Sequence, residues 1–162
     1  MKKSGIFLVT AFLIACSYSV YTTGYPHLKT IAILSFENNT TEYNLEEVIF
    51  NNLTNYFEND GRLKIVSISP DCQLEGQILD YSNKILTYAG SDVDEYEVRI
   101  LFNLIFTDLK KNNIIWQNKA LIISETYSSS DETSDLSTED EVQNEIIKDM
   151  FDIIIKESLE EW

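Results

Sequence analysis

Apolar residues recur at two different spacings along this chain, and each spacing predicts one kind of element. From Tyr96 to Phe106 every second residue is apolar, which is typical of a β-strand with one buried face. From Leu45 to Phe57 the apolar residues follow a three- and four-residue spacing, which predicts an amphipathic helix. The same helical spacing runs from Val142 to Leu159. The chain therefore combines strands and helices in an α+β fold.

The ends of both predicted helices carry recognisable signals. Asn44 with Glu47, and Thr138 with Glu141, fit a capping box, in which two side chains satisfy backbone amides that are free at a helix start. Gly61 suits the left-handed conformation in which many helices end. We therefore expect capped helices that begin after Asn44 and after Thr138.

Three further segments have the composition of strands. Leu28 to Phe36 is dense in apolar and β-branched residues, and Leu63 to Ile68 repeats this pattern after the first helix. Cys72 to Ile78 alternates apolar with polar residues, as in a strand with one wet face. These strands precede the long alternating strand and are expected to join its sheet.

A long hairpin follows the alternating strand. Lys110 to Asn113 form its turn, because asparagine tolerates positive φ, and the apolar residues of the returning strand are Ile114, Trp116, Ala120 and Ile122. The element order is strand, helix, two strands, long hairpin and helix. It predicts two helices packed on one face of a mainly antiparallel four- to five-stranded sheet.

The first residues of the chain have the pattern of an export signal. Lys2 and Lys3 precede an apolar run that is shorter than the roughly 20 residues a membrane-spanning helix needs. Leu13-Ile14-Ala15-Cys16 then resembles the bacterial lipobox, which implies cleavage before Cys16 and acylation of that cysteine. An ordinary signal peptide, or an apolar first strand with an incidental cysteine, is the alternative. We therefore divide the chain into a signal peptide (1–15), a lipidated tether (16–27) and a single α+β domain (28–162).

The net charge and the cysteine count limit which partners and which disulfide bonds are expected. The formal net charge of −15 disfavours nucleic acid and loose adhesion to anionic head groups. The chain has two cysteines, and acylation of Cys16 leaves Cys72 without a disulfide partner. Because Cys72 lies in an alternating strand pattern, we expect it to be buried.

No arrangement of residues in the sequence predicts an enzyme. His27 is the only histidine and lies in the tether, where an exposed histidine without a role is expected. Acidic residues around Asp92 and around Asp131 lack the spacing of a calcium-binding loop. We predict no catalytic residue, no metal site and no cofactor.

After the predicted cleavage site, Lys110 and Lys111 form the one local basic spot, and they are expected at the tip of the longest hairpin. They are either solubilising residues of an exposed turn or a tip that meets an anionic group such as a lipid phosphate, which lysine binds as a point charge.

Several short segments resemble one family in their order and spacing, over nearly all of the chain after the lipobox. They comprise Leu28-Lys29-Thr30-Ile31-Ala32-Ile33, Phe36-Glu37-Asn38-Asn39-Thr40, Leu45-Glu46-Glu47, Asp60-Gly61-Arg62-Leu63-Lys64-Ile65-Val66, Leu74-Glu75-Gly76, Tyr96-Glu97-Val98, Ile115-Trp116 and Glu161-Trp162. Together they resemble the lipopolysaccharide-assembly lipoproteins, LptE.

The resemblance implies an outer-membrane lipoprotein that faces the periplasm. Members of that family sit as a plug inside the β-barrel LptD, help to assemble the barrel and help to deliver lipopolysaccharide to the outer leaflet. It implies lipopolysaccharide contact through basic residues, for which Lys110 and Lys111 are the candidates. The alternative is a regulatory envelope lipoprotein, such as a peptidoglycan-synthase activator or a secretion-pore component, because those families also open with a strand like Ile31 to Asn38.

Overall fold

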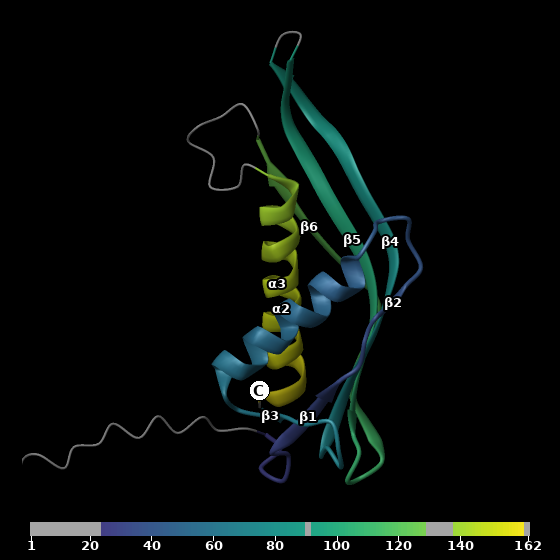
Figure 1. Cartoon of the computed structure of the whole chain (residues 1–162), viewed down its shortest axis with the longest axis vertical. Coiled ribbons are helices and arrows are strands. Elements are labelled where there is room, and N and C mark those ends of the chain that lie inside the picture. The colour runs from purple at the N-terminus through teal and green to yellow at the C-terminus, as the bar shows by residue number, and fades with distance from the viewer. Residues whose placement is uncertain (1–23, 90–91, 129–137, 161–162) are drawn as a thin grey trace, which may run out of the picture.

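A mixed β-sheet and two helices make up the part of the chain that the structure describes (Figure 1). This computed structural model describes residues 24–89, 92–128 and 138–160. The predicted signal peptide and Cys16 lie outside these ranges and remain predictions. The sheet has six strands in the order β3-β1-β4-β5-β6, and β2 pairs with β4 beside β1.

Three long antiparallel strands form one half of the sheet. They are β4 (Cys72–Ala89), β5 (Asp92–Asp108) and β6 (Asn113–Tyr127). The predicted strand from Cys72 to Ile78 is thus confirmed, but it continues for eleven further residues as one arm of a β4–β5 hairpin. The far ends of β4 and β5 rise beyond the helices in Figure 1.

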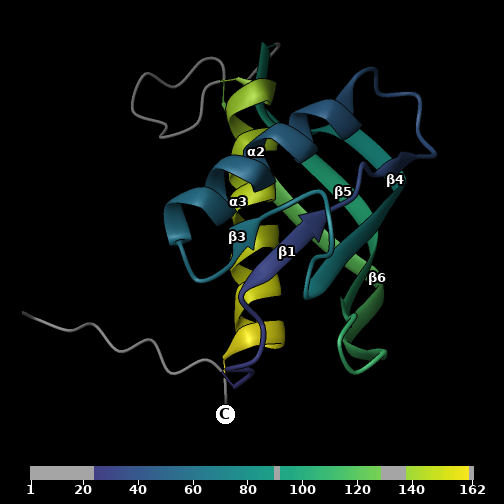
Figure 2. The same ribbon diagram turned by 60° about the horizontal axis from the view of Figure 1, so that its bottom comes forward.

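Three short strands form the other half, and all of them are parallel to their neighbours. They are β1 (Thr30–Ile33), β2 (Glu37–Asn38) and β3 (Lys64–Ile65). The helix between β2 and β3 supplies the crossover that parallel strands require (Figure 2). The expectation of a mainly antiparallel sheet was therefore wrong, because residues 28–36 and 63–68 pair in parallel around a crossover helix. Strand β2 lies just after the predicted strand from Leu28 to Phe36 and was not foreseen.

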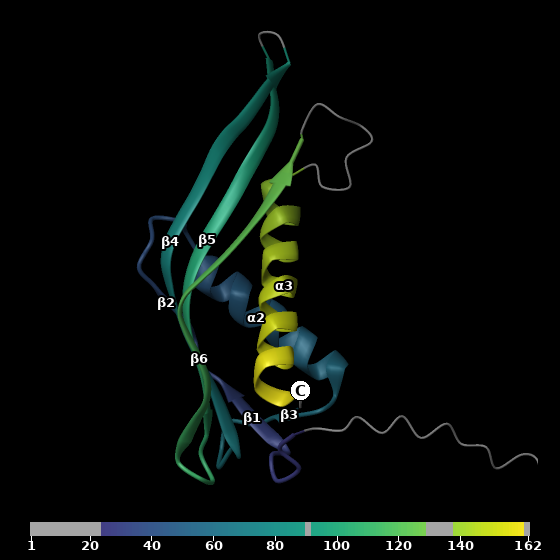
Figure 3. The ribbon, with the colours of Figure 1, turned by 180° about the vertical axis from the view of Figure 1, so that it is seen from behind.

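Both helices, α2 (Leu45–Asp60) and α3 (Glu139–Leu159), cover the same face of the sheet, as predicted (Figures 1 and 3). The buried residues of α2 recur at every fourth position, and those of α3 recur at three- and four-residue spacing. The rings of Phe57 and Phe151 meet edge to face, with centroids 5.0 Å apart, where α2 crosses α3. Each such buried side chain stabilises the fold by roughly 1.5–3 kcal/mol. The core lies between this helical layer and the sheet.

The two predicted helix starts have different outcomes. Thr138 and Glu141 form the complete capping box, and this prediction is confirmed. Asn44 instead adopts the left-handed conformation, with φ of 64°, and makes no side-chain cap hydrogen bond, so the predicted capping box at Asn44 was wrong. Gly61 ends α2 with φ of 71°, as expected, and its amide donates to the carbonyl of Phe57.

Strand β6 carries its apolar residues on both faces. Irregularities in its pairing with β5 fall between Phe102 and Leu104 and between Phe106 and Thr107. Trp116 lies opposite buried Phe106, whereas Ile122 lies opposite Leu101 on the face without helices. The strand was correctly predicted, but its apolar residues do not share one face, because each irregularity shifts the two-residue alternation.

Among the described strands, the longest hairpin is formed by β4 and β5 and not by the strands that flank the lysine-bearing turn. Its arms pair from Cys72 opposite Asp108 to Ala89 opposite Asp92. The turn with Lys110 and Lys111 joins β5 to β6 at the other end of the sheet. The expectation that these lysines lie at the tip of the longest hairpin was therefore wrong.

Candidate functional site

The turn that carries Lys110 and Lys111 is held against the start of the domain. Asn112 adopts φ of 53° in the turn, in agreement with the predicted role of asparagine there. The amide of Leu109 donates to the carbonyl of Asp71, just before β4, at 2.9 Å. The two lysines therefore belong to a turn whose backbone is fixed on one side.

Lys110 forms an ion pair instead of projecting freely. Its Nζ lies 2.9 Å from Oδ1 of Asp71 and donates to the carbonyl of His27 at 3.1 Å. The other carboxylate oxygen of Asp71 accepts from the amides of Lys29 and Thr30, at 2.7 and 3.1 Å. The hydrogen bond from Lys110, followed by that from the Lys29 amide, lowers the pKa of Asp71 to about 2. This carboxylate is therefore ionised over the physiological range.

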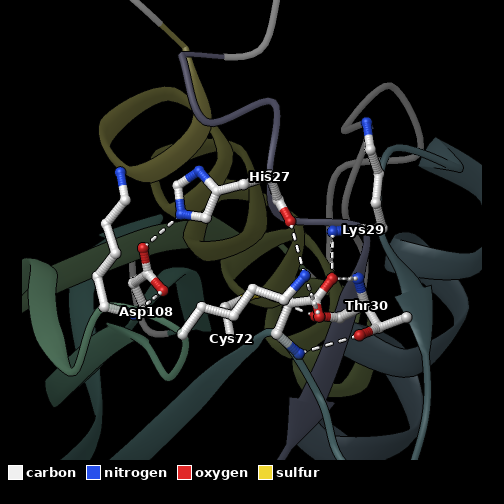
Figure 4. Close-up of polar contacts among 8 residues, drawn as sticks. His27, Lys29, Thr30, Cys72 and Asp108 are labelled. Carbon is white, nitrogen blue, oxygen red and sulfur yellow. Dashed lines mark hydrogen bonds and ion pairs between the residues drawn. The ribbon is translucent and has the colours of Figure 1, made fainter.

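A second carboxylate, Asp108, binds His27 beneath the same turn (Figure 4). Nε2 of His27 lies 2.6 Å from Oδ2 of Asp108, and the amide of Lys111 donates to Oδ1 at 2.9 Å. Burial of Asp108 raises its pKa, but the hydrogen bonds from His27 and Lys111 outweigh burial and leave the pKa below its usual value. His27 is thus not simply exposed as predicted, since only 27% of its side chain is accessible.

Residues 24–27, which were expected to belong to the tether, dock on the domain. The amide of Gly24 donates to the carbonyl of Leu159 at the end of α3, and the rings of Tyr25 and His27 lie edge to face. Together with the His27–Asp108 contact, these bonds fix the place where the chain enters the domain. We call His27, Asp71, Asp108 and Lys110 the entry clasp.

Cys72 lies beneath the entry clasp and is buried, as predicted. Its Sγ is 3.4 Å from the carbonyl of Thr30. Burial, followed by the negative charges of Asp71 and Asp108, raises the pKa of the thiol to about 12. Because the thiolate is the reactive form, this thiol is inert in the folded protein.

Of the two lysines in this turn, Lys111 is the one whose charge remains available to contact an anionic group. Its side chain is exposed and forms no ion pair with any residue in the described ranges. Lys110 is half exposed but already paired. Contact of either lysine with a lipid phosphate stays a prediction, in which Lys111 has the more accessible charge.

The described residues bring together no group of three or more His, Cys, Asp or Glu side chains that could hold a metal ion. The acidic segment around Asp131 lies outside those residues. Within the same ranges, neither helix is long and apolar enough to cross a membrane.

The sequence alone did not reveal the entry clasp. His27 and Asp108 are 81 positions apart in the chain, and neither residue belongs to a repeating pattern. Asp108 does continue the alternation of β5 by one more inward position after Phe106, and a carboxylate at such a position needs a partner. The inward position of Asp108 was therefore the one feature of the sequence that could have indicated a buried partner for this carboxylate.

The fold defines a class of small α+β domains that includes bacterial lipoproteins. Protein XCC0632 from Xanthomonas campestris has a TM-score of 0.56 and 11% identity, over 82% of this chain and 89% of that protein. Lipoprotein GNA1162 from Neisseria meningitidis has a TM-score of 0.50 and 8% identity, over 79% and 99%. A PelC dodecamer from Paraburkholderia phytofirmans has a TM-score of 0.52 and 16% identity, over 82% and 88%.

The sequence identifies the family within this fold class. A family model described as LptE, lipopolysaccharide-assembly, matches residues 28–157. The chain therefore belongs to the LptE lipopolysaccharide-assembly family. The comparison with curated proteins found no match. The structural likenesses, at these low identities, show the fold alone.

Proposed function

We propose that this protein is an outer-membrane lipoprotein that plugs a β-barrel of the LptD type, helps to assemble it and assists lipopolysaccharide transport to the outer leaflet. The observation that carries the proposal is the family match over residues 28–157. The fold supports it, because one face of the sheet is covered by helices while the other is free to contact a partner (Figure 3). No catalytic step is assigned to the protein.

The anchor in this proposal is the acylated Cys16. The lipobox-like residues Leu13 to Cys16 support it, and several acyl chains would attach the protein stably, at roughly 0.8 kcal/mol per buried methylene. Mass spectrometry of the membrane-extracted protein tests this step. An unmodified cysteine, or a chain cleaved elsewhere, would contradict it.

The acidic surface suits a plug inside a barrel with a partly basic lumen. Barrel interiors are typically polar, and a chain with a net charge of −15 gains from cations that line the wall. Capture of the barrel should weaken as the salt concentration rises. Capture that does not depend on salt would contradict the charge matching without touching the family assignment.

Lys111, with Lys110 beside it, is the proposed contact to a lipopolysaccharide phosphate. The support is the exposed Lys111 ammonium at a backbone-fixed turn. Lys111→Gln should reduce lipopolysaccharide binding, whereas Lys119→Gln, which removes one exposed cation from β6, should not. Equal binding by both variants would remove the site from the proposal.

The deciding experiment is affinity capture of the tagged, lipidated protein from gently solubilised outer membranes of its host, followed by mass spectrometry. A stoichiometric β-barrel of the LptD type is expected. Recovery of a peptidoglycan synthase or a secretion pore would instead support the regulatory-lipoprotein alternative, which the shared fold does not separate from the plug.

A further inference from the structure

Strand β6 has a strand neighbour on only one of its two sides. It is the last strand in the order β3-β1-β4-β5-β6 and runs along the border of the sheet next to α3 (Figure 3). Within the described ranges, its only paired strand is β5, and no backbone hydrogen bond joins its outer side to another element. Every second residue of an edge strand points its N–H and C=O groups outward, where a further strand can bind them.

The part of this edge from Leu121 to Tyr127 is regular enough to receive a strand, and we call it the open edge. Its seven residues pair with Tyr96 to Phe102 without interruption. They span roughly 20 Å, the length of an ordinary strand. The outer side of β4 beyond its pairing with β2 is less suitable, because irregularities after Ile78, Ile85 and Thr87 interrupt it.

The side chains of the open edge alternate between the two faces of the sheet. Glu125 pairs with Val98, which is completely buried, so both side chains lie on the face that the helices cover. Ile123 and Tyr127, two positions before and after Glu125, are buried on the same face. The side chains exposed on the opposite face are Ile122, Ser124 and Thr126. Glu125 is therefore the one charged residue of the open edge, and it faces the helices.

Glu125 lies near two further carboxylates, which belong to α3. Burial, followed by the negative charges of Asp149 and Glu145, raises the pKa of Glu125. Burial also raises the pKa of Asp149, although nearby Lys148 opposes this. Lys148 pairs with Glu145 at 2.5 Å, whereas neither Glu125 nor Asp149 forms an ion pair with a residue in ranges 24–89, 92–128 and 138–160. Two half-buried carboxylates beside the open edge therefore lack a paired cation among the described residues.

These charges decide which strand fits the open edge. An inward-pointing charge is one of the devices by which an edge strand avoids pairing with a copy of itself. Two open edges brought together would place the Glu125 and Asp149 carboxylates of both copies near each other, in chains whose net charge is −15. A strand with a lysine or an arginine at the facing position gains from the same charges. The carboxylates thus disfavour a second copy and favour a basic partner.

We propose that the open edge receives an extended segment of another protein, which adds a strand beside β6 and places a basic residue opposite Glu125. Directly opposed residues have Cβ atoms about 4.5–5.5 Å apart, so the cation reaches Glu125 and binds it as a charge-assisted pair. The residues two positions before and after the cation lie beside Ile123 and Tyr127, and we expect them to be apolar. The segment therefore has the pattern apolar-x-basic-x-apolar. The inference goes beyond the plug function and does not require it.

The first step of the test identifies the segment that occupies the open edge in the cell. A photoreactive side chain replaces Thr126, an exposed residue of the open edge, in the full, lipidated chain produced in its host. The control places the same group at Glu58, an exposed residue of α2. Mass spectrometry should find a protein segment with the expected pattern crosslinked at Thr126 and not at Glu58.

The second step measures how that segment binds. A synthetic peptide of the crosslinked segment is added to the purified full chain, and hydrogen exchange should slow between Leu121 and Tyr127. Glu125→Gln should weaken peptide binding about tenfold, whereas Glu157→Gln, which removes an exposed charge from α3, should not change it. Because Glu125→Gln also relieves the repulsion from Asp149, its melting temperature should not fall, so weaker binding does not arise from unfolding.

Several results would overturn the inference. They are the absence of a protein crosslink at Thr126, a crosslinked segment without a basic residue, and equal peptide binding by the wild type and Glu125→Gln. A crosslink between two copies of this chain, or to lipopolysaccharide, would also overturn it by assigning the open edge to a different occupant. None of these results decides the plug function, which the capture of the barrel tests separately.

Discussion

A methyl group added at Gly76 tests how closely the segment that joins β1 to β2, which carries Phe36, packs on the sheet. A Cβ at this position would lie 2.1 Å from Cε1 of Phe36, and two further ring carbons would lie 2.5 Å away. The ring of Phe36 is itself buried in the core, with 3% exposure. Gly76→Ala therefore forces either the ring or strand β4 to move by more than an ångström.

Two effects of opposite sign determine how much Gly76→Ala changes the free energy of unfolding. Alanine restricts the unfolded chain, which stabilises a protein by about 0.4–1 kcal/mol where the backbone accepts it. Overpacking of a well-packed core costs about 1–3 kcal/mol. Because the contact is far inside van der Waals distance and the ring is enclosed, the steric cost dominates. We expect a net loss near the upper end, about 2 kcal/mol, and a fall in melting temperature of roughly 5–10 °C.

Urea denaturation followed by circular dichroism measures this loss, and a double-mutant cycle assigns its cause. In a Phe36→Ala background the clash is absent, so the same change at Gly76 should become neutral or stabilising. A Gly76→Ala variant as stable as the wild type, or one equally destabilised in both backgrounds, would refute the reasoning.

Three further predictions concern the clasp and the helix starts. Because the folded-state pKa of Asp71 is lowered to about 2, its contribution to stability is present above the unfolded value of about 3.9 and is lost as pH falls toward 2. The stability difference between wild type and Asp71→Asn should therefore shrink over that window in acid titrations, and a constant difference would contradict the pairing. Cys72 should resist a thiol reagent at pH 8 until urea unfolds the protein; rapid labelling of native protein would show that it is not enclosed. Thr138→Ala should cost about 1 kcal/mol in urea denaturation, whereas Asn44→Gly, at a left-handed position without a cap bond, should cost nothing; equal losses would argue against the cap geometry.

The predictable parts of the fold are those in which a repeating pattern is unbroken. Helix α3 has a cap, a continuous apolar stripe and a defined length, so its sequence specifies it well. Strand β4 was foreseen only as far as Ile78, because pairing irregularities after Ile78 and after Ile85 shift the alternation that marks a strand. The parallel pairing of β1 was missed because a short apolar strand does not indicate its direction.

The candidate site was less predictable than the fold. Lys110 was identified by its charge in an acidic chain, but its partner Asp71 lies in a different strand connection, and no local pattern links the two residues. The same holds for Asn103, Gln77 and Glu37, which meet only because β2, β4 and β5 are neighbours in the sheet. Contacts of single polar residues across a sheet depend on strand register, which was not available before the structure.

The entry clasp also fixes the end of the sheet at which the chain enters the domain. The chain enters the domain where Asp108 ends β5, and the sheet extends from there to Ala89 along the 18 residues of β4, or about 60 Å at roughly 3.3 Å per residue. With a short acylated leader, as proposed, the clasped end stays close to the lipid surface. The far end of the β4–β5 hairpin then lies at the opposite end of the sheet from the attached end, so the length of the sheet limits how far from the surface the domain can reach.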